Sequence, residues 1–215
     1  RQPKEKEARA AETLWDVVVV GGGPAGRMAA GAASARGHRV LLLEKNKMLG
    51  KKLLITGGGR CNVLNNKPDV RALLNKYKKS EQFLFSAFSQ FAAKEALAFF
   101  HTRGMPTKEE NEGRLFPAAQ KAQAVWDIFT QYMQKGAVEV MTSAVVVHIA
   151  KDPEKNFSIQ LKGGEMVHAR ACVVATGGTS RPETGSTGDG YKWLQKLGHR
   201  VEENGTALVP VALKD

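Results

Sequence analysis

The sequence contains little cysteine, with only Cys61 and Cys172 among its 215 residues. Two thiols give no disulfide framework of the kind that stabilises small secreted domains, so a reducing, cytoplasmic location is expected. Long apolar runs are also missing. No stretch approaches the roughly 20 apolar residues that span a bilayer, so no membrane segment is expected. The five histidines are scattered without metal-ligand spacing, and no metal site is expected.

The first 14 residues mix both charges and lack an apolar core. This pattern is typical neither of a secretory signal nor of an acid-poor transit peptide, and it indicates a solvated polar tail. The sequence begins with Arg1 rather than methionine, which leaves an upstream targeting segment open. The whole chain is 42% apolar and 25% charged, which is ordinary for a globular protein able to bury a sizeable core.

Acidic residues are scarce between Lys45 and Lys79, where Asp69 stands alone against ten basic residues and the window carries +9 of the chain's +11. Such a window is typical of a surface that binds a nucleic acid backbone. A solvated basic face and local compensation for cofactor phosphates account for the same charges, and the sequence leaves all three interpretations open. The basic residues are Lys45, Lys47, Lys51, Lys52, Arg60, Lys67, Arg71, Lys76, Lys78 and Lys79.

A glycine fingerprint follows the apolar run Val17–Val20, where GGGPAG places glycines at the G-x-G-x-x-G spacing. The first glycine permits a tight turn, the second lets a diphosphate approach the backbone, and the third lets a helix pack closely on the strand. A helix is expected from Pro24 to about Arg36, and a second buried strand at Arg39–Leu43. Glu44 lies 18 residues after Gly26, near the offset at which a carboxylate accepts from ribose hydroxyls.

These elements predict a site for an adenine dinucleotide, although an ordinary strand–helix turn is the simpler alternative. The motif does not distinguish NAD from FAD.

From about Val70 to Arg103 the pattern is helical, and an aromatic stripe within residues 83–92 is interpreted as core. A loop is expected around residues 110–120, with a helix from near Lys121. Residues 137–175 are mostly strand, with a hairpin turn at 162–165. The order indicates an α/β Rossmann-like domain with a β-meander and a helical excursion.

Beyond the fingerprint, several strings resemble one known family, the NAD(P)/FAD-dependent oxidoreductases that include aminoacetone-oxidase-like, bile-acid-reductase-like and ribosomal-RNA dihydrouridine-synthase-like flavoproteins. The resemblance covers about residues 15 to 213. GKKLLITGGGRCN and TGSTGDGY are specific together, whereas the glycine fingerprint alone is not. The matching strings are GGGPAG (21–26), LLEKN (42–46), GKKLLITGGGRCN (50–62), GRLFP (113–117), ATGG (175–178) and TGSTGDGY (184–191).

The resemblance implies FAD as the bound dinucleotide, with Glu44 on the adenosine ribose and the backbone of Val146 at the adenine. It implies that Lys45, Lys52 and the segment 57–62 follow the diphosphate, ribityl and flavin end. Thr176 and Gly177 match the family's second glycine signature. The residues expected to bind the cofactor are therefore Gly21, Gly23, Pro24, Ala25, Gly26, Glu44, Lys45, Lys52, Gly57, Gly58, Gly59, Arg60, Cys61, Asn62, Val146, Thr176 and Gly177.

The chain departs from the family pattern at Arg27, Leu64 and Ala119, where an apolar residue, threonine and serine are usual. Arg27 is expected to reach a phosphate or to point to solvent. The family's chains continue into an inserted domain, so this one resembles an amino-terminal fragment. The expected parts are a polar tail (1–14), two parts of the FAD-binding domain (15–65 and 118–215) and a helical excursion (66–117).

Three functions fit the resemblance. The first is an oxidoreductase in which NAD(P)H reduces FAD, which then reduces an organic or nucleobase substrate, including uracil in ribosomal RNA. The second is a flavin oxidase of small amines such as aminoacetone, and the third is an inactive cofactor-binding fragment. Arg60 is a candidate for stabilising negative charge on reduced flavin or substrate, with a phosphate-binding or surface arginine as the equal alternative. Cys61 is interpreted as a packed cysteine, and Asp189 as the cap of the following helix. No general acid can be named, and the oligomeric state is left open.

Overall fold

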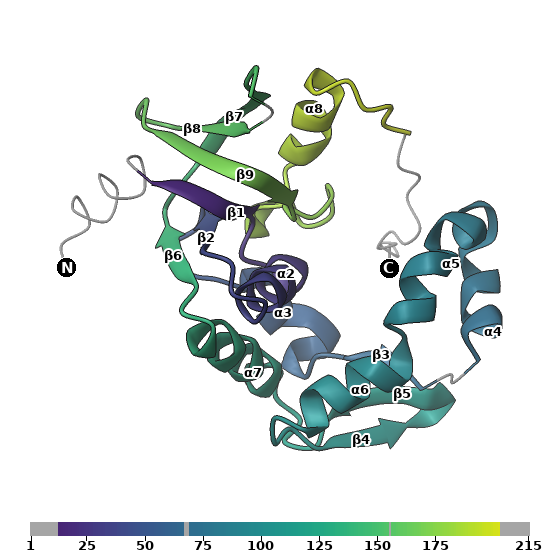
Figure 1. Ribbon diagram of the computed structural model, residues 1–215. Helices are drawn as coiled ribbons and strands as arrows, with labels where there is room; N and C mark the ends of the chain where they lie inside the picture. Colours follow the sequence, from purple (N-terminus) through teal and green to yellow (C-terminus); the bar gives the residue numbers. More distant parts are fainter. Residues whose placement is uncertain (1–12, 67–68, 155, 203–215) are drawn as a thin grey trace, which may run out of the picture.

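The computed structural model describes residues 13–66, 69–154 and 156–202, and its centre is a six-stranded sheet (Figure 1). Four neighbouring strands run parallel, and the last two are antiparallel hairpin strands, so the predicted Rossmann-like α/β fold with a meander is confirmed. The strands, in sheet order, are β6 (Glu139–Thr142), β2 (Val40–Glu44), β1 (Leu14–Val20), β9 (Met166–Val174), β8 (Phe157–Leu161) and β7 (Val146–Lys151).

Both faces of the central strand β1 are covered, which explains its uninterrupted valines. Val19 faces a cluster with Ala30 of α2 (Pro24–Ser34) and Met133 of α7 (Ala122–Lys135). Val18 faces the opposite cluster, which contains Trp193 of α8 (Asp189–Lys196). Helices α2 and α7 therefore lie on one side of the sheet and α8 lies on the other (Figure 1).

A second, small antiparallel sheet joins the end of the first expected FAD-binding part to the 66–117 excursion, in the order β3 (Leu64–Asn65), β5 (Arg114–Pro117) and β4 (Thr107–Glu110). The loop expected around 110–120 is therefore partly strand, because β5 pairs with strands on both sides. The other helices and 3-10 turns between β2 and α7 are α3 (Lys51–Ile55), the 3-10 turns Thr56–Gly59, Asn75–Ser80 and Asn111–Gly113, α4 (Val70–Leu74), α5 (Glu81–Gln90) and α6 (Ala93–His101).

The excursion is joined to the Rossmann part by an aromatic cluster between α6 and α7. Phe99 and Phe100 of α6 lie 5.9 and 5.7 Å from the ring of Phe129 of α7. All three side chains are buried. This packing positions α3 and the segment after it relative to the carboxyl ends of β1 and β2.

The aromatic stripe of α5 is not core, contrary to the expectation from its spacing. No residue of α5 is buried, and the side chain of Phe83 is 86% exposed. Helical spacing shows only that one face is apolar and says nothing about whether another element covers it. Within the residues described, α5 packs mainly on α4 and the 75–80 turn. No helix in these segments is long and apolar enough to cross a bilayer.

Candidate cofactor site

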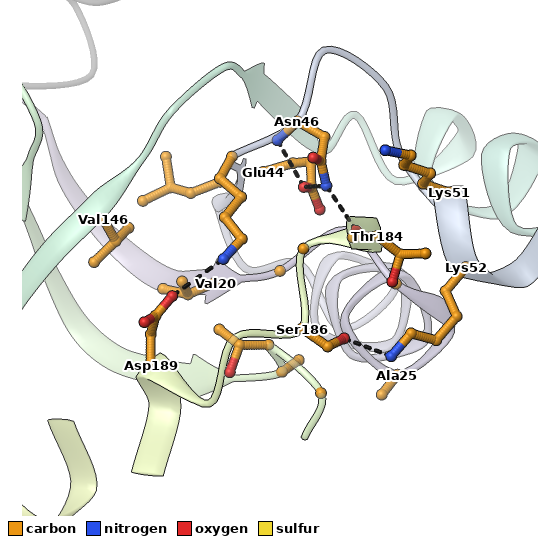
Figure 2. A pocket seen from close by; sticks show the side chains of 18 of the residues that line it. Val20, Ala25, Glu44, Asn46, Lys51, Lys52, Val146, Thr184, Ser186 and Asp189 are labelled. Carbon is orange, nitrogen blue, oxygen red and sulfur yellow. Dashed lines mark hydrogen bonds and ion pairs between the residues drawn. The ribbon is translucent and has the colours of Figure 1, made fainter. Parts of the chain in front are cut away.

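A cavity of about 220 Å³ opens at the carboxyl ends of β1, β2 and β9 (Figure 2). In an open parallel sheet this edge is where nucleotide ligands bind. The cavity brings together ten of the predicted site residues from five separate segments: Gly21, Gly23, Pro24, Ala25, Glu44, Lys45, Lys52, Val146, Thr176 and Gly177.

The three fingerprint glycines differ in what surrounds them. A Cβ on Gly21, at φ +112°, would lie 2.5 Å from the carbonyl oxygen of Ala175, and a Cβ on Gly26 would lie 1.9 Å from the carbonyl oxygen of Gly21. These two glycines allow the turn and the close packing of α2 on the strand ends. A Cβ on Gly23 would meet nothing within 4 Å. Gly23 therefore leaves open space beside the backbone, as a diphosphate requires.

The amino end of α2 is available to an anion. Gly23 is its N-cap, no side chain caps the helix, and its first turn contains no acid. The first N–H groups of a helix lack intrahelical partners, and the dipole places partial positive charge at the same end. Pro24 and Ala25, which begin the helix, line the cavity. The open glycine and the uncapped helix end together fit the two phosphates of a dinucleotide.

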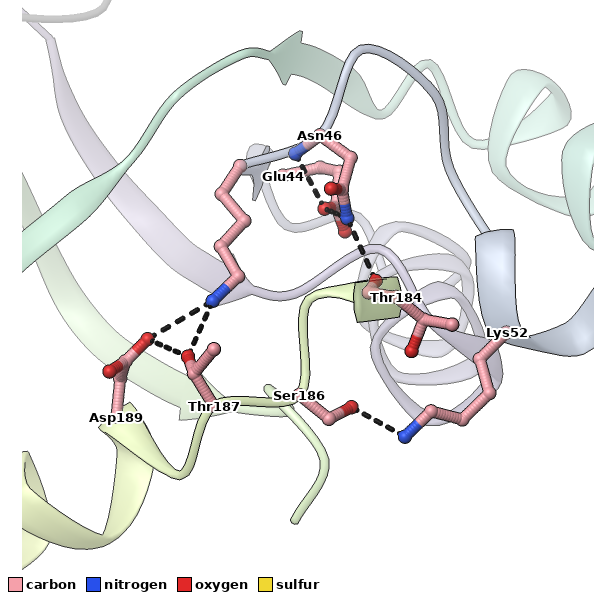
Figure 3. A network of polar contacts seen from close by, with 8 residues as sticks. Glu44, Asn46, Lys52, Thr184, Ser186, Thr187 and Asp189 are labelled. Atoms are coloured by element: carbon pink, nitrogen blue, oxygen red, sulfur yellow. Dashed lines mark hydrogen bonds and ion pairs between the residues drawn. The ribbon is translucent and has the colours of Figure 1, made fainter. Parts of the chain in front are cut away.

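Glu44 ends β2 with a buried carboxylate that is 7% exposed (Figure 3). Its Oε2 accepts from the backbone N–H of Gly22 at 2.7 Å, and its Oε1 accepts from the backbone and side-chain nitrogens of Asn46 at 2.8 and 2.7 Å. A carboxylate has about four lone-pair sites, so acceptor capacity is left for ligand hydroxyls. The side chain lines the cavity at the end of the second strand, where a ribose is bound in this type of fold.

The 180–189 segment supplies four residues of the cavity lining and is held by polar contacts to the residues that follow β2 (Figure 3). Lys45 Nζ donates to Thr187 Oγ1 at 2.7 Å and pairs with Asp189 at 3.1 Å. Lys52 Nζ donates to Ser186 Oγ at 2.6 Å. Lys51 and Asn46 donate to the carbonyl oxygens of Glu183 and Thr184 at 2.8 and 3.1 Å.

The position of Asp189 corrects its interpretation as a helix cap. The cap of α8 is Gly188, and Asp189 instead accepts from the hydroxyl of Thr187 and from Lys45. The hydrogen bond from the Thr187 hydroxyl has the larger effect and Lys45 the smaller, and together they hold the pKa of the Asp189 carboxyl below its usual value. Asp189 is therefore an ionised partner for Lys45 at the rim of the cavity.

Part of the cavity lining is apolar. Val146 begins β7, is 8% exposed and lines the cavity together with Ala144 and Trp193. These three residues suit a flat ring such as a purine. Thr176 and Gly177 follow β9 beside the glycine turn, where a Cβ on Gly21 would lie 3.1 Å from the Cα of Thr176, and Gly177 has φ +73°, a conformation that favours glycine.

The segment 57–62 lies beyond the residues that line the cavity. Gly57, Gly58 and Gly59 lie after α3, are exposed to solvent and all have positive φ. Asn62 is exposed as well. Their expected role at the flavin end stays a prediction.

Arg60 and Cys61 have internal partners. Arg60 Nη1 donates to Glu110 and Gln120, both at 2.8 Å, and its guanidinium lies 4.1 Å from the ring of Phe116. The thiol of Cys61 is 5% exposed, and burial raises its pKa. Burial disfavours the reactive thiolate, so the geometry supports a packed cysteine.

Arg27 contradicts both expectations from the sequence, because it neither points to solvent nor lines the cavity. Its side chain is fully buried between α2 and α7, where Nη2 donates to the carbonyl oxygen of Trp126 at 2.7 Å and to Thr130 Oγ1. Its guanidinium lies 4.6 Å from the ring of Trp126. The partners come from α7, about a hundred residues further along the chain.

Several cavity residues were not singled out from the sequence. Asn46 and Ser186 stand inside strings that carried the resemblance, so a signal for them existed. Trp193, by contrast, is one apolar residue in a helix and gave none. No group of histidine, cysteine or acidic side chains suited to a metal occurs in the described ranges. The missed cavity residues are Val20, Leu43, Asn46, Gly50, Ala144, Ala175, Thr184, Gly185, Ser186 and Trp193, whereas Lys51 and Asp189 were noted only as a basic residue and as a helix cap.

Residues 15–207 match the family described as HI0933-like protein Rossmann domain. The chain is 33% identical over 199 residues to the ribosomal RNA dihydrouridine synthase of Escherichia coli (strain K12), covering 93% of this chain and 48% of that protein. It is 31% identical over 198 residues to the 3-dehydro-bile acid delta(4,6)-reductase of Clostridium scindens, covering 91% and 47%. The chain spans about half the length of these curated relatives.

Among solved structures, the open conformation of a flavocytochrome c3 fumarate reductase is similar to this chain with a TM-score of 0.65 at 19% identity. The likeness covers 90% of this chain and 43% of the other. At this identity the likeness establishes the fold alone.

Proposed function

Because the chain belongs to the HI0933-like Rossmann-domain family, a Rossmann-type FAD-binding family, we propose that it is the cofactor-binding part of an FAD-dependent oxidoreductase. The observation that carries this proposal is the cavity in which an uncapped helix end, an open glycine and a buried acid converge. The family membership agrees with the resemblance first seen in the sequence motifs.

Each part of the site has a task toward the cofactor. The amino end of α2 and Gly23 would hold the diphosphate, and Glu44 would accept from the hydroxyls of the adenosine ribose. Val146 and Trp193 would contact the adenine ring. Bound flavin supplies the hydride or electron transfer, and the protein supplies position and electrostatics.

The direction of the chemistry is proposed from the relatives. One is named as a reductase and the other as a dihydrouridine synthase. We therefore propose that the whole protein takes electrons from NAD(P)H and reduces an organic or nucleobase substrate. Oxidation of a small amine is the competing outcome, and it predicts flavin reduction by the amine without a nicotinamide.

The first experiment is a titration of the purified chain with FAD, followed by calorimetry and flavin fluorescence. We expect saturable binding at one site per chain, and weaker binding by Glu44→Ala. A matched control is Glu139→Ala, on the neighbouring strand β6 but outside the cavity lining. Folded wild-type protein that takes up no FAD would contradict the proposal.

An RNA substrate would meet only part of the basic window, because the window does not form one free surface. Lys45, Lys51 and Lys52 donate to the 180–189 segment, and Arg60 pairs with Glu110. Arg71, Lys76, Lys78 and Lys79 are exposed on α4 and the turn after it, whereas Lys67 lies outside the described residues.

A test of RNA binding should therefore use the exposed residues of α4 and the turn after it. Four exposed cations that each release counterions from RNA give a steep fall of affinity with salt. Replacing Lys76, Lys78 and Lys79 with glutamine is expected to reduce that slope by about three, if these residues contact phosphates. RNA binding that is undetectable near physiological salt would remove the RNA substrate from the proposal and leave the FAD site untouched.

A further inference from the structure

The buried guanidinium of Arg27 lacks the partners that a buried charge requires. Its side chain has 0% exposure, and Nε and Nη1 have no hydrogen-bond partner. In the segments that the structure describes, no carboxylate lies within ion-pair distance of it. Buried charges are normally paired, so an unpaired one calls for a compensating group.

The compensation found inside the protein is partial. Nη2 donates to Trp126 O and to Thr130 Oγ1, and the rings of Trp126 and Phe129 lie 4.6 and 5.6 Å from the guanidinium. Asp127 attracts it electrostatically, but that carboxylate is exposed and already accepts from Gln123. Burial lowers the pKa of Arg27 to about 10, which keeps the side chain charged at neutral pH.

The guanidinium lies close to a residue that lines the candidate site. Arg27 is in the first turn of α2, where its backbone N–H donates to Gly23 O at 3.0 Å. Its Nη1 would be 3.3 Å from a Cβ placed on Gly50. Gly50 lines the cavity, as do Gly23 and Ala25 at the start of α2, so the buried charge is near the backbone of this wall without lining the cavity itself.

We propose that Arg27 is the buried counter-charge of the ligand's diphosphate, acting through the first turn of α2 and the backbone of Gly50 without touching the phosphates. This inference rests on the proposed FAD site. Arg27 is a positioning residue in this role, and it adds a full charge to the partial charge of the helix end. It makes the site selective for ligands that carry phosphate over the same ligands without it.

Arg27 differs in one measurable way from the lysines at the rim of the cavity. The ammonium group of Lys51 is at the surface, where salt screens it within about 8 Å at physiological ionic strength. A buried charge under the cavity wall is screened much less. The contribution of Arg27 therefore persists at high salt, whereas that of the surface lysines disappears.

The test compares ADP with adenosine by calorimetry, since the two share the ribose and adenine contacts and differ in the diphosphate. The readout is the ratio of the Kd of adenosine to the Kd of ADP. We expect Arg27→Met to lower this ratio about tenfold, the size for unit charges roughly 10 Å apart at an effective dielectric near 20, and to leave the Kd of adenosine unchanged. Arg27→Lys keeps the charge and is expected to retain most of the ratio.

Two further arms separate charge from packing. Thr130→Val removes a hydrogen-bond partner of Arg27 but not its charge, so it should leave the ratio as in wild type. The tenfold effect of Arg27→Met should also persist at about 0.5 M salt. Arg27→Gln provides the neutral variant if the methionine variant fails to fold.

The outcomes are distinct. A neutral variant in which both affinities fall together, or neither changes, overturns the role of Arg27 and leaves the FAD site standing. An effect that vanishes at high salt also overturns it. A wild-type chain that binds neither ADP nor FAD overturns the proposed function together with this inference.

Discussion

Replacing Gly23 with serine should separate the stability of the fold from the binding of the cofactor. Gly23 caps α2 with φ −73° and ψ −179°, an extended conformation that serine adopts readily, and its missing Cβ points into open space. Serine is a better N-cap than glycine because its Oγ accepts from a first-turn N–H. Gly23→Ser therefore satisfies, from within the protein, the same N–H groups that the diphosphate needs.

The two effects have opposite signs. We expect Gly23→Ser to stabilise the protein by a few tenths of a kcal/mol. The competing hydroxyl removes at least one hydrogen bond to a charged group, worth about 1.5–3 kcal/mol, so the affinity for FAD should fall roughly tenfold to a hundredfold. Gly23→Ala is the matched control, since it adds the same Cβ without an acceptor and measures the steric part alone.

Thermal unfolding and FAD titration on the same preparations provide the assay. The reasoning predicts a Tm that is equal or higher in Gly23→Ser, a lower affinity for FAD, and a smaller loss of affinity in Gly23→Ala. If Gly23→Ser bound FAD as tightly as the wild type while remaining folded, the phosphates would lie elsewhere and the assignment of the α2 end would be refuted.

Three other predictions concern the same region. Gly26→Ala places a Cβ 1.9 Å from the carbonyl oxygen of Gly21 and should lower the free energy of unfolding by about 1–3 kcal/mol, whereas a wild-type denaturation midpoint would show that the turn relaxes freely. Glu44→Gln turns an acceptor of three hydrogen bonds into a group with two donors, so both Tm and FAD affinity should fall, and an unchanged Tm would argue against the buried network. Burial raises the pKa of the Cys61 thiol, and it raises that of the half-buried Cys172 to about 12. A thiol reagent at pH 8 should therefore label both slowly in the native protein and rapidly after unfolding, and rapid native labelling would contradict the raised pKa values.

The parts of the fold predicted correctly are those in which partners are near in sequence. The apolar run before the fingerprint, the glycine turn and the alanine-rich helix are contiguous, and β1 pairs with β2 only about twenty residues away. The hairpin of β8 and β9 was likewise predicted from a local turn. Gly26 was likewise interpreted correctly from its spacing to Gly21, whose carbonyl oxygen is what a Cβ on Gly26 would meet.

The parts that were wrong depend on distant partners. Arg27 is buried because Trp126, 99 positions further on, accepts its hydrogen bond, and Asp189 is drawn to Lys45 across 144 positions. No spacing rule encodes such contacts. The prediction that the stripe containing Phe83 is core was wrong for the converse reason. The helix was predicted correctly, but no element in the described residues covers its apolar face.

The Glu44 carboxylate has a consequence for how fast a ligand is captured. By joining Gly22 to Asn46, it fixes the turn after β1 and the end of β2 in one arrangement before any ligand arrives. This half of the site is preorganised, so occupying it should require little ordering of the backbone. Any slow step of association is then expected in the 180–189 segment, which Lys45, Lys51 and Lys52 hold at the edge of the cavity, rather than in the turn after β1.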